Sequence, residues 1–213
     1  MSETPHIHIV GAGPTGLFCS YQLLKCGYKV SLYDQMSGVG KKFLVAGNGG
    51  LNITHSEDIE NFSSRYFKDA NLFKELLGEF SNDDLRSWCL ELGVETFVGS
   101  SGRVFPKEFK AAQLLSKWLG NLKENSNFSL HLKTKLLSIK DKKLKFCKED
   151  EFVVESEITI LALGGSSWKK TGSDGLWTSL LKELDVGLIP FRAMNCGFEV
   201  SWSEHFKDSF DVF

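Results

Sequence analysis

The fold is decided by the stretch HIHIVGAGPTGLFCSYQLLKCGYKVSLYD, residues 6–34. Residues 6–11 alternate and then run apolar, as a buried strand does, and residues 14–27 have helical spacing that stops at Gly27. Residues 28–34 have the pattern of a second strand. The order of strand, helix and strand predicts a βαβ unit.

A glycine-rich hexapeptide, GAGPTG, stands between the first strand and the helix and has the G-x-G-x-x-G pattern of dinucleotide binding. In this pattern the first glycine makes a tight turn, the second lets a pyrophosphate touch the backbone, and the third lets helix and strand pack closely. Amide groups and the dipole at the start of the helix favour the phosphates. The alternative is that the glycines serve only a turn. The candidate cofactor-binding residues are Gly11, Gly13, Pro14, Thr15, Gly16 and, at the end of the second strand, Asp34.

Asp34 narrows the choice of cofactor. A carboxylate at this place accepts a hydrogen bond from a free ribose 2′-hydroxyl and repels the 2′-phosphate of NADP. NAD and the adenosine half of FAD both satisfy this condition, so the βαβ unit leaves both open.

A second glycine-rich stretch, KKFLVAGNGGLNIT, occupies residues 41–54. Three glycines within four positions predict neither a helix nor an ordinary strand but a loop whose backbone passes close to a bound group. The flat ring of an extended FAD is such a group, and a simple NAD dehydrogenase needs no such loop here. A lysine would offset phosphate charge and an asparagine would hydrogen-bond a ring edge. The alternative is a mobile surface loop. The candidates are Lys41, Lys42, Ala46, Gly47, Gly49, Gly50 and Asn52.

The same stretch resembles the segment G-R-K-x-x-x-Ser/Thr-G-x-G-x-C-N-x-T of the aminoacetone oxidase family of bacterial FAD-dependent oxidoreductases. The resemblance continues through residues 102–112 (GRVFPKEFKAA), 162–175 (ALGGSSWKKTGSDG) and 190–203 (PFRAMNCGFEVSWS), so it covers nearly the whole chain. Leu51 stands where many members have cysteine, and Lys41 where arginine is usual. These departures indicate a distinct branch, whose substrate can differ from that of the branch with amine-oxidase activity.

The resemblance implies an α/β, Rossmann-like FAD/NAD(P)-binding domain with a parallel sheet, a crossover interrupted by a β-meander, and a strand that ends in an Ala-x-Gly-Gly turn. Residues 158–165 match that strand and its turn, and residues 128–154 alternate in short bursts as a meander does. The resemblance adds Leu136, Gly164 and Gly165 to the cofactor site. Ordinary sheet core is the alternative for each, and for the side chain of Leu136 it is the favoured interpretation.

The domain organisation is expected to be simple, because no repeat, low-complexity tract or Pro/Ser-rich linker interrupts the chain. The resemblance implies an FAD domain over residues 1–190 and the beginning of an inserted substrate domain, truncated, over 191–213, so that the chain looks like the N-terminal part of such a protein. The other predicted elements are helices at residues 70–80, 83–93 (capped by Ser81 or Asn82), 109–124 and 172–185 and a hairpin at 94–105.

Composition argues against several functions. A formal net charge of −2 with interspersed charges gives no basic face for nucleic acid. The longest apolar runs, such as residues 158–163, are far too short to span a membrane, and a strand that begins by His6 leaves no room for a signal peptide. Five scattered cysteines without a C-x-x-C pair indicate a reducing compartment, so a cytoplasmic location is expected. Oligomeric state is not set by these patterns.

Catalytic residues are not predicted by any spacing in the chain. No Ser/His/Asp or Cys/His arrangement and no metal-ligand pattern occurs. His55 is a candidate neighbour of the ring and Arg103 a candidate for an acidic substrate group, with surface-loop and salt-bridge roles as alternatives. The expected function is an FAD-dependent oxidoreductase that oxidises a small organic substrate, an amine being one candidate, by hydride transfer to flavin, with NAD(P)H as a candidate electron donor. The alternatives are an NAD-binding dehydrogenase and a truncated nucleotide-binding remnant without turnover.

Overall fold

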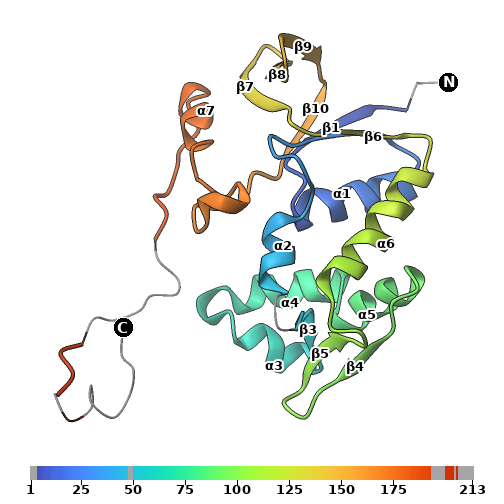
Figure 1. Ribbon diagram of the computed structural model, residues 1–213, viewed down its shortest axis with the longest axis vertical. Coiled ribbons are helices and arrows are strands. Elements are labelled where there is room, and N and C mark those ends of the chain that lie inside the picture. Colours follow the sequence, from blue (N-terminus) through green and yellow to red (C-terminus); the bar gives the residue numbers. More distant parts are fainter. Residues whose placement is uncertain (1–3, 48–49, 193–199, 204, 206–213) are drawn as a thin grey trace.

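The centre of the molecule is a four-stranded parallel sheet with the strand order β10-β1-β2-β6 (Figure 1). The computed structural model describes residues 4–47, 50–192, 200–203 and 205. The predicted βαβ unit is confirmed, since β1 and β2 pair in parallel on either side of the first helix. The strands are β1 (His6–Val10), β2 (Lys29–Tyr33), β6 (Phe128–His131) and β10 (Ile158–Leu161).

One face of the sheet is covered by helices, which lie below it in Figure 1. Alternate strand residues such as Ile9 and Leu32 are fully buried there, as side chains of period two require. The helix side adds an aromatic group in which Trp88 and Trp118 meet edge to face at 4.8 Å. The covering helices are α1 (Pro14–Lys25) and α6 (Ala111–Glu124), and α5 (Asn82–Glu91) adds Trp88 and Cys89 to the same apolar cluster.

The opposite face carries the predicted antiparallel meander, which lies above the sheet in Figure 1. A second apolar cluster joins the two layers: Val10 and Tyr33 from the sheet pack with Leu136, Leu144 and Phe146 from the meander. The chain then enters β10, so the crossover from β6 to β10 is interrupted by a meander as expected. The meander strands are β7 (Lys135–Lys140), β8 (Lys143–Cys147) and β9 (Glu151–Glu155).

A smaller sheet of order β3-β5-β4 and several short helices lie beyond the helical layer. The predicted hairpin is confirmed by β4 and β5, and the predicted cap is Ser81, whose hydroxyl accepts the Asp84 N–H while the Asp84 carboxylate accepts the Ser81 N–H. The elements are β3 (Thr54–His55), α3 (Ile59–Ser64), a 3-10 turn η1 (Phe67–Asp69), α4 (Ala70–Glu79), β4 (Thr96–Val98) and β5 (Arg103–Pro106).

Two expectations about helices were wrong in extent. Residues 41–54 were expected to lack a helix, but α2 (Lys41–Ala46) forms there, because the glycines of this stretch follow the KKFLVA segment and Gly47 only ends the helix. A helix was expected over residues 172–185, but α7 spans only Thr178–Glu183 after a 3-10 turn, η2 (Lys169–Thr171), because Gly172 and Gly175 both have positive φ.

Within the described part of the chain, every helix is too short or too polar to cross a membrane. The predicted boundary near residue 190 lies beside residues 193–199, and these and residues 206–213 fall outside the described residues. The expected start of a substrate domain at 191–213 therefore stays a prediction.

Candidate functional site

A cavity of about 760 Å³ opens at the carboxyl ends of β1, β2 and β10. Its walls come from the glycine-rich turn after β1, the start of β7, and the segment 171–180 after β10. Here the chain passes from β1 to β2 on one side and returns to β10 on the other, so the cavity lies at a topological switch point, where open α/β sheets bind ligands. Its volume is in the range of ligand and cofactor pockets.

The three glycines of the turn differ in what surrounds them. Gly11 has φ +109°, and a Cβ there would lie 2.2 Å from the backbone oxygen of Ala162. A Cβ on Gly16 would lie 1.9 Å from the oxygen of Gly11. Gly13 lines the cavity, and a Cβ there would meet no atom of the described residues within 4 Å. The fold therefore requires the first and third glycines, whereas beside the second the described residues leave open space on the cavity wall.

Asp34 connects the end of β2 to the glycine-rich turn. Its Oδ2 accepts a hydrogen bond from the Ala12 N–H at 2.6 Å, and its Oδ1 accepts one from the Met36 N–H at 2.7 Å. A carboxylate oxygen has two lone pairs, so both oxygens retain acceptor capacity for a ligand hydroxyl. Asp34 therefore holds the loop and faces the cavity at once.

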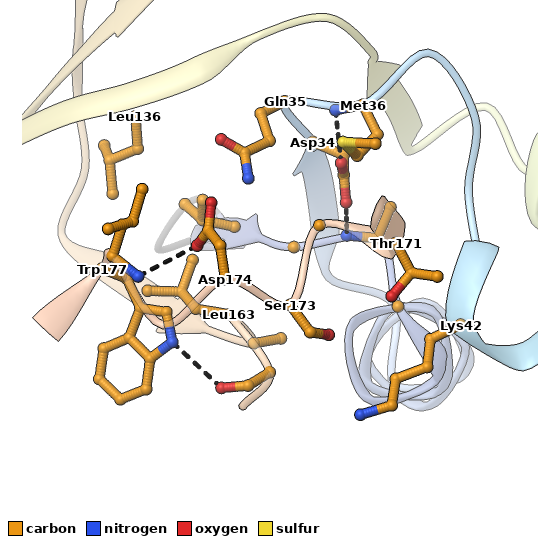
Figure 2. Close-up of a pocket in the computed structure, with 18 of the residues that line it drawn as sticks. Asp34, Gln35, Met36, Lys42, Leu136, Leu163, Thr171, Ser173, Asp174 and Trp177 are labelled. Carbon is orange, nitrogen blue, oxygen red and sulfur yellow. Dashed lines mark hydrogen bonds between the residues drawn. The ribbon is translucent and has the colours of Figure 1, made fainter. Parts of the chain in front are cut away.

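The cavity changes character along its length (Figure 2). Leu136, Leu163 and Trp177 lie together at one end, where the Trp177 indole N–H donates to the Gly164 carbonyl oxygen at 3.1 Å. Lys42 and Thr171 lie on the opposite side of the view, and the Lys42 ammonium donates to the Ser167 hydroxyl. One end is thus apolar and the other is polar and cationic.

Most of the predicted cofactor residues line this cavity. They are Gly11, Gly13, Pro14, Thr15, Asp34, Lys41, Lys42, Leu136, Gly164 and Gly165. The side chain of Leu136 also belongs to the cluster between sheet and meander, as the favoured interpretation expected. Sequence reasoning missed the wall formed by segment 171–180, although the repeated glycines of TGSDG were a signal that this segment is not a regular helix.

Other predicted residues are not among those that line the cavity. Gly16 packs behind the turn, and Ala46 lies at the end of α2. The close neighbour of Gly47 is Ala111 of α6, whose Cβ would lie 2.3 Å from a Cβ on Gly47. The Asn52 amide donates to the carbonyl oxygens of Thr54 at 2.7 Å and Val104 at 3.1 Å. Gly49 lies outside the described residues.

His55 and Arg103 lie in the small sheet and do not line the cavity. The His55 ring contacts the Ser101 carbonyl oxygen through Nε2 at 2.9 Å, and its Nδ1 lies 3.2 Å from the Glu57 N–H nitrogen. These contacts give His55 a structural role within β3 and its loop.

A group of histidines lies on the face of the parallel sheet that carries the meander. His8 is buried, its Nδ1 lies 3.2 Å from the Tyr33 hydroxyl, and its ring centroid is 4.3 Å from that of His6. Tyr33 stacks on His131. Burial lowers the pKa of His8 to about 4, with further lowering from His6, His131 and Lys29, and burial likewise lowers the pKa of His6 and of His131.

A parallel sheet, a glycine-rich turn between strand and helix, and a carboxylate at the end of the next strand define a Rossmann-like dinucleotide-binding domain. The chain belongs to the family described as the HI0933-like protein Rossmann domain, whose model matches residues 5–197. This family is part of the superfamily of FAD-dependent oxidoreductases. The narrower aminoacetone oxidase branch stays a prediction.

Curated relatives match this chain over about half of their own length. A ribosomal RNA dihydrouridine synthase of Haemophilus influenzae is 26% identical over 199 residues, which are 91% of this chain and 48% of that protein. A 3-dehydro-bile acid delta(4,6)-reductase of Clostridium scindens is 25% identical over 189 residues, 86% of this chain and 45% of the relative.

Solved structures share the fold at low sequence identity. THI4 of Thermovibrio ammonificans has a TM-score of 0.56 at 15% identity, covering 86% of this chain and 64% of its own. The 3-ketosteroid-delta4-(5alpha)-dehydrogenase of Rhodococcus jostii has a TM-score of 0.58 at 12% identity, covering 78% and 47%. These likenesses confirm the predicted fold class.

Proposed function

We propose that the protein binds FAD in this cavity and that the bound flavin exchanges hydride with a small organic substrate. The observation that carries the proposal is Gly13, which lines the cavity and has no protein atom near the position of a Cβ. Because Gly13 has no side chain, its backbone is accessible from the cavity at the start of a 12-residue helix. A pyrophosphate can therefore approach this backbone closely.

The rest of the cavity supports the same cofactor. The apolar end formed by Leu136, Leu163 and Trp177 suits a flat base, and Asp34 suits a sugar hydroxyl. Lys42 supplies positive charge at the other end, where Pro14 begins α1. When bound, the flavin supplies the hydride chemistry, and the protein binds and orients it.

FAD is favoured over NAD by the family to which the chain belongs. NADP is disfavoured, because a second phosphate would meet the Asp34 carboxylate. NAD(P)H as the electron donor, a cytoplasmic location and the assignment of Gly49 to cofactor binding are further parts of this proposal.

The substrate has two candidates. The resemblance to the aminoacetone oxidase family favours a small amine, which would be oxidised. The names of the two curated relatives favour the reduction of a carbon–carbon double bond, since one makes dihydrouridine and the other is a delta(4,6)-reductase. We propose a small molecule rather than an RNA base, because the formal net charge of −2 offers no excess of basic residues for a polyanion.

Reconstitution of the purified protein with FAD is the first test of the proposed cofactor. Purified protein mixed with FAD and passed through a desalting column is expected to retain absorption at about 450 nm. Calorimetric titrations with FAD, NAD and NADP give the order of affinity, which is expected to fall in that order. A colourless protein that binds NAD more tightly than FAD would reverse the assignment.

Flavin spectra then test the reaction. Bleaching of the flavin band by an amine would support oxidation of that class. Recovery of the band when a conjugated enone or uridine-containing RNA is added to the reduced protein would support reduction, with the RNA arm contradicting the small-molecule proposal. Retained FAD without either response would support a nucleotide-binding remnant without turnover.

A further inference from the structure

We propose that Asp174 is a sugar-hydroxyl acceptor of the cofactor pocket, in addition to Asp34. This inference rests on the proposed function, because it assigns a role within the same cavity. Asp174 lies in the wall formed by segment 171–180 and is drawn between Leu163 and Gln35 in Figure 2.

The backbone on both sides of Asp174 is tightly constrained. Gly172 has φ +87°, and a Cβ there would lie 3.2 Å from Met36 Cγ. Gly175 has φ +70°, and a Cβ there would lie 2.7 Å from the Cβ of Ser166. Ser173, between them, is buried and forms a bridge with Trp168. The turn that carries Asp174 is therefore packed against the loop that follows Asp34, and its side chain is presented from a fixed position.

The two carboxylates of the cavity differ in their hydrogen bonds. Both oxygens of Asp34 accept backbone N–H groups. In Asp174, Oδ1 accepts the Leu176 N–H at 3.0 Å, and within the part of the chain that the structure describes Oδ2 has no hydrogen bond or ion pair. Among the described residues, Asp174 therefore keeps one oxygen with its full acceptor capacity unused on the cavity wall.

The position of Asp174 corresponds to the sugar of a dinucleotide. The apolar end with Leu136 and Trp177 lies to one side of it, and Lys42 with the glycine-rich turn lies to the other. A base in the apolar end and phosphates at the turn leave the connecting sugar between them, beside Asp34 and Asp174.

The turn itself does not require a carboxylate. Asparagine also accepts an N–H at its Oδ1 and forms the same local turn, so an aspartate kept only for the Leu176 N–H is replaceable by asparagine without loss. Asp174→Asn therefore preserves the turn and removes the charged acceptor. Asp174→Ser is a second variant that keeps an oxygen acceptor for the turn and removes the other oxygen.

The test uses calorimetric titration of the whole chain with ADP, 2′-deoxy-ADP and 3′-deoxy-ADP. We expect Asp174→Asn and Asp174→Ser to weaken ADP binding about tenfold, the effect of losing one hydrogen bond to a charged acceptor. One of the deoxy ligands should bind the unmodified protein about tenfold more weakly than ADP and lose little further affinity in the variants. Asp150→Asn, at an exposed turn of the meander, is the matched control and should bind ADP normally.

The inference and the proposed function fail in different ways. If the unmodified protein binds neither ADP nor FAD, both the proposed function and the inference about Asp174 are wrong. If it binds ADP but both Asp174 variants bind as tightly as Asp150→Asn, Asp174 is not an acceptor and the proposed function stands. The inference is also wrong if each deoxy ligand loses the same affinity relative to ADP in the unmodified protein and in the Asp174 variants.

Discussion

The two glycine-rich stretches of this chain, residues 11–16 and 46–50, look alike in sequence and are used differently by the structure. In the first, Gly11 and Gly16 meet the backbone of the fold itself, and Gly13 faces an open cavity. In the second, Gly47 lets α2 approach Ala111 of α6. The first stretch therefore combines a folding requirement with an open position on the cavity wall, while in the second Gly47 has a packing cause and Gly50 a backbone one, its φ of +134°.

The role of a glycine is given by what a Cβ at its position would touch. Close packing of protein atoms indicates a structural requirement, because interiors leave no room for an added methyl group. Open space on a cavity wall indicates room kept for a ligand. The same criterion separates Gly13 from Gly47, although the sequence motif treats both as cofactor residues.

The largest effect is expected for Gly11→Ala. The substitution combines φ +109° with a Cβ placed only 2.2 Å from the backbone oxygen of Ala162, just after β10. We expect it to lower the free energy of unfolding by about 3–5 kcal/mol or to prevent folding. Urea unfolding beside Gly120→Ala, a helical glycine with open space around it, measures this. A loss below about 1 kcal/mol would show that the fold does not require a glycine at position 11.

Acid should destabilise the parallel sheet, whose strand β1 leads into the glycine-rich turn at residues 11–16. The pKa of His8, at about 4 in the folded chain, lies below the value of 6.5 expected on unfolding. The unfolded state therefore binds the proton first, and the stabilisation present above pH 6.5 is lost as the pH falls towards 4. We expect a loss of about 2–3 kcal/mol over this range. His8→Gln should flatten the profile measured by urea unfolding, and an unchanged slope in that variant would exclude His8 as the cause.

A smaller loss is expected for Gly47→Ala, in the second stretch. The added methyl group meets Ala111 Cβ at 2.3 Å, so we expect a cost of about 1–3 kcal/mol. Because the cause is one contact, Ala111→Gly in the same chain should recover most of the lost stability, and a double-mutant cycle measures this coupling. Affinity for ADP should stay that of the unmodified protein. If the double variant recovers no stability, or if Gly47→Ala weakens ADP binding without lowering stability, Gly47 has a role in cofactor binding and the packing explanation is wrong.

Much of the fold could be predicted from the sequence because its signals are local. The alternation of residues 6–11, the stop at Gly27 and the cap at Ser81 each act within a few residues, and the structure has them as expected. Helix α2 was missed because the glycines that follow it dominated the pattern, although the six residues themselves suit a helix.

The site was predictable only in part, because its other walls come from distant segments. The turn after β1 and the role of Asp34 could both be predicted from the G-x-G-x-x-G motif, because this motif implies a known strand, turn and helix arrangement with an acidic residue after the next strand. Asn52 was assigned to the cavity, yet its amide is used by the carbonyl oxygens of Thr54 and Val104, and no local pattern announces the second of these. Asp174 was overlooked because its place in the cavity wall depends on the packing of Gly172 against Met36, which no local pattern predicts.

Gly13→Ala tests the central claim most directly, namely that the first stretch keeps one position open for a ligand. Its Cβ meets no protein atom, so the free energy of unfolding should change by less than about 1 kcal/mol, the scale of a helix-cap substitution. Binding of ADP and FAD, measured by calorimetry, should weaken tenfold or more because the methyl group occupies the place of the pyrophosphate. Gly120→Ala, inside helix α6, should raise the free energy of unfolding by about 0.5–1 kcal/mol and leave the binding of ADP and FAD unchanged. A folded Gly13→Ala protein that binds ADP and FAD as tightly as the unmodified chain would contradict the account.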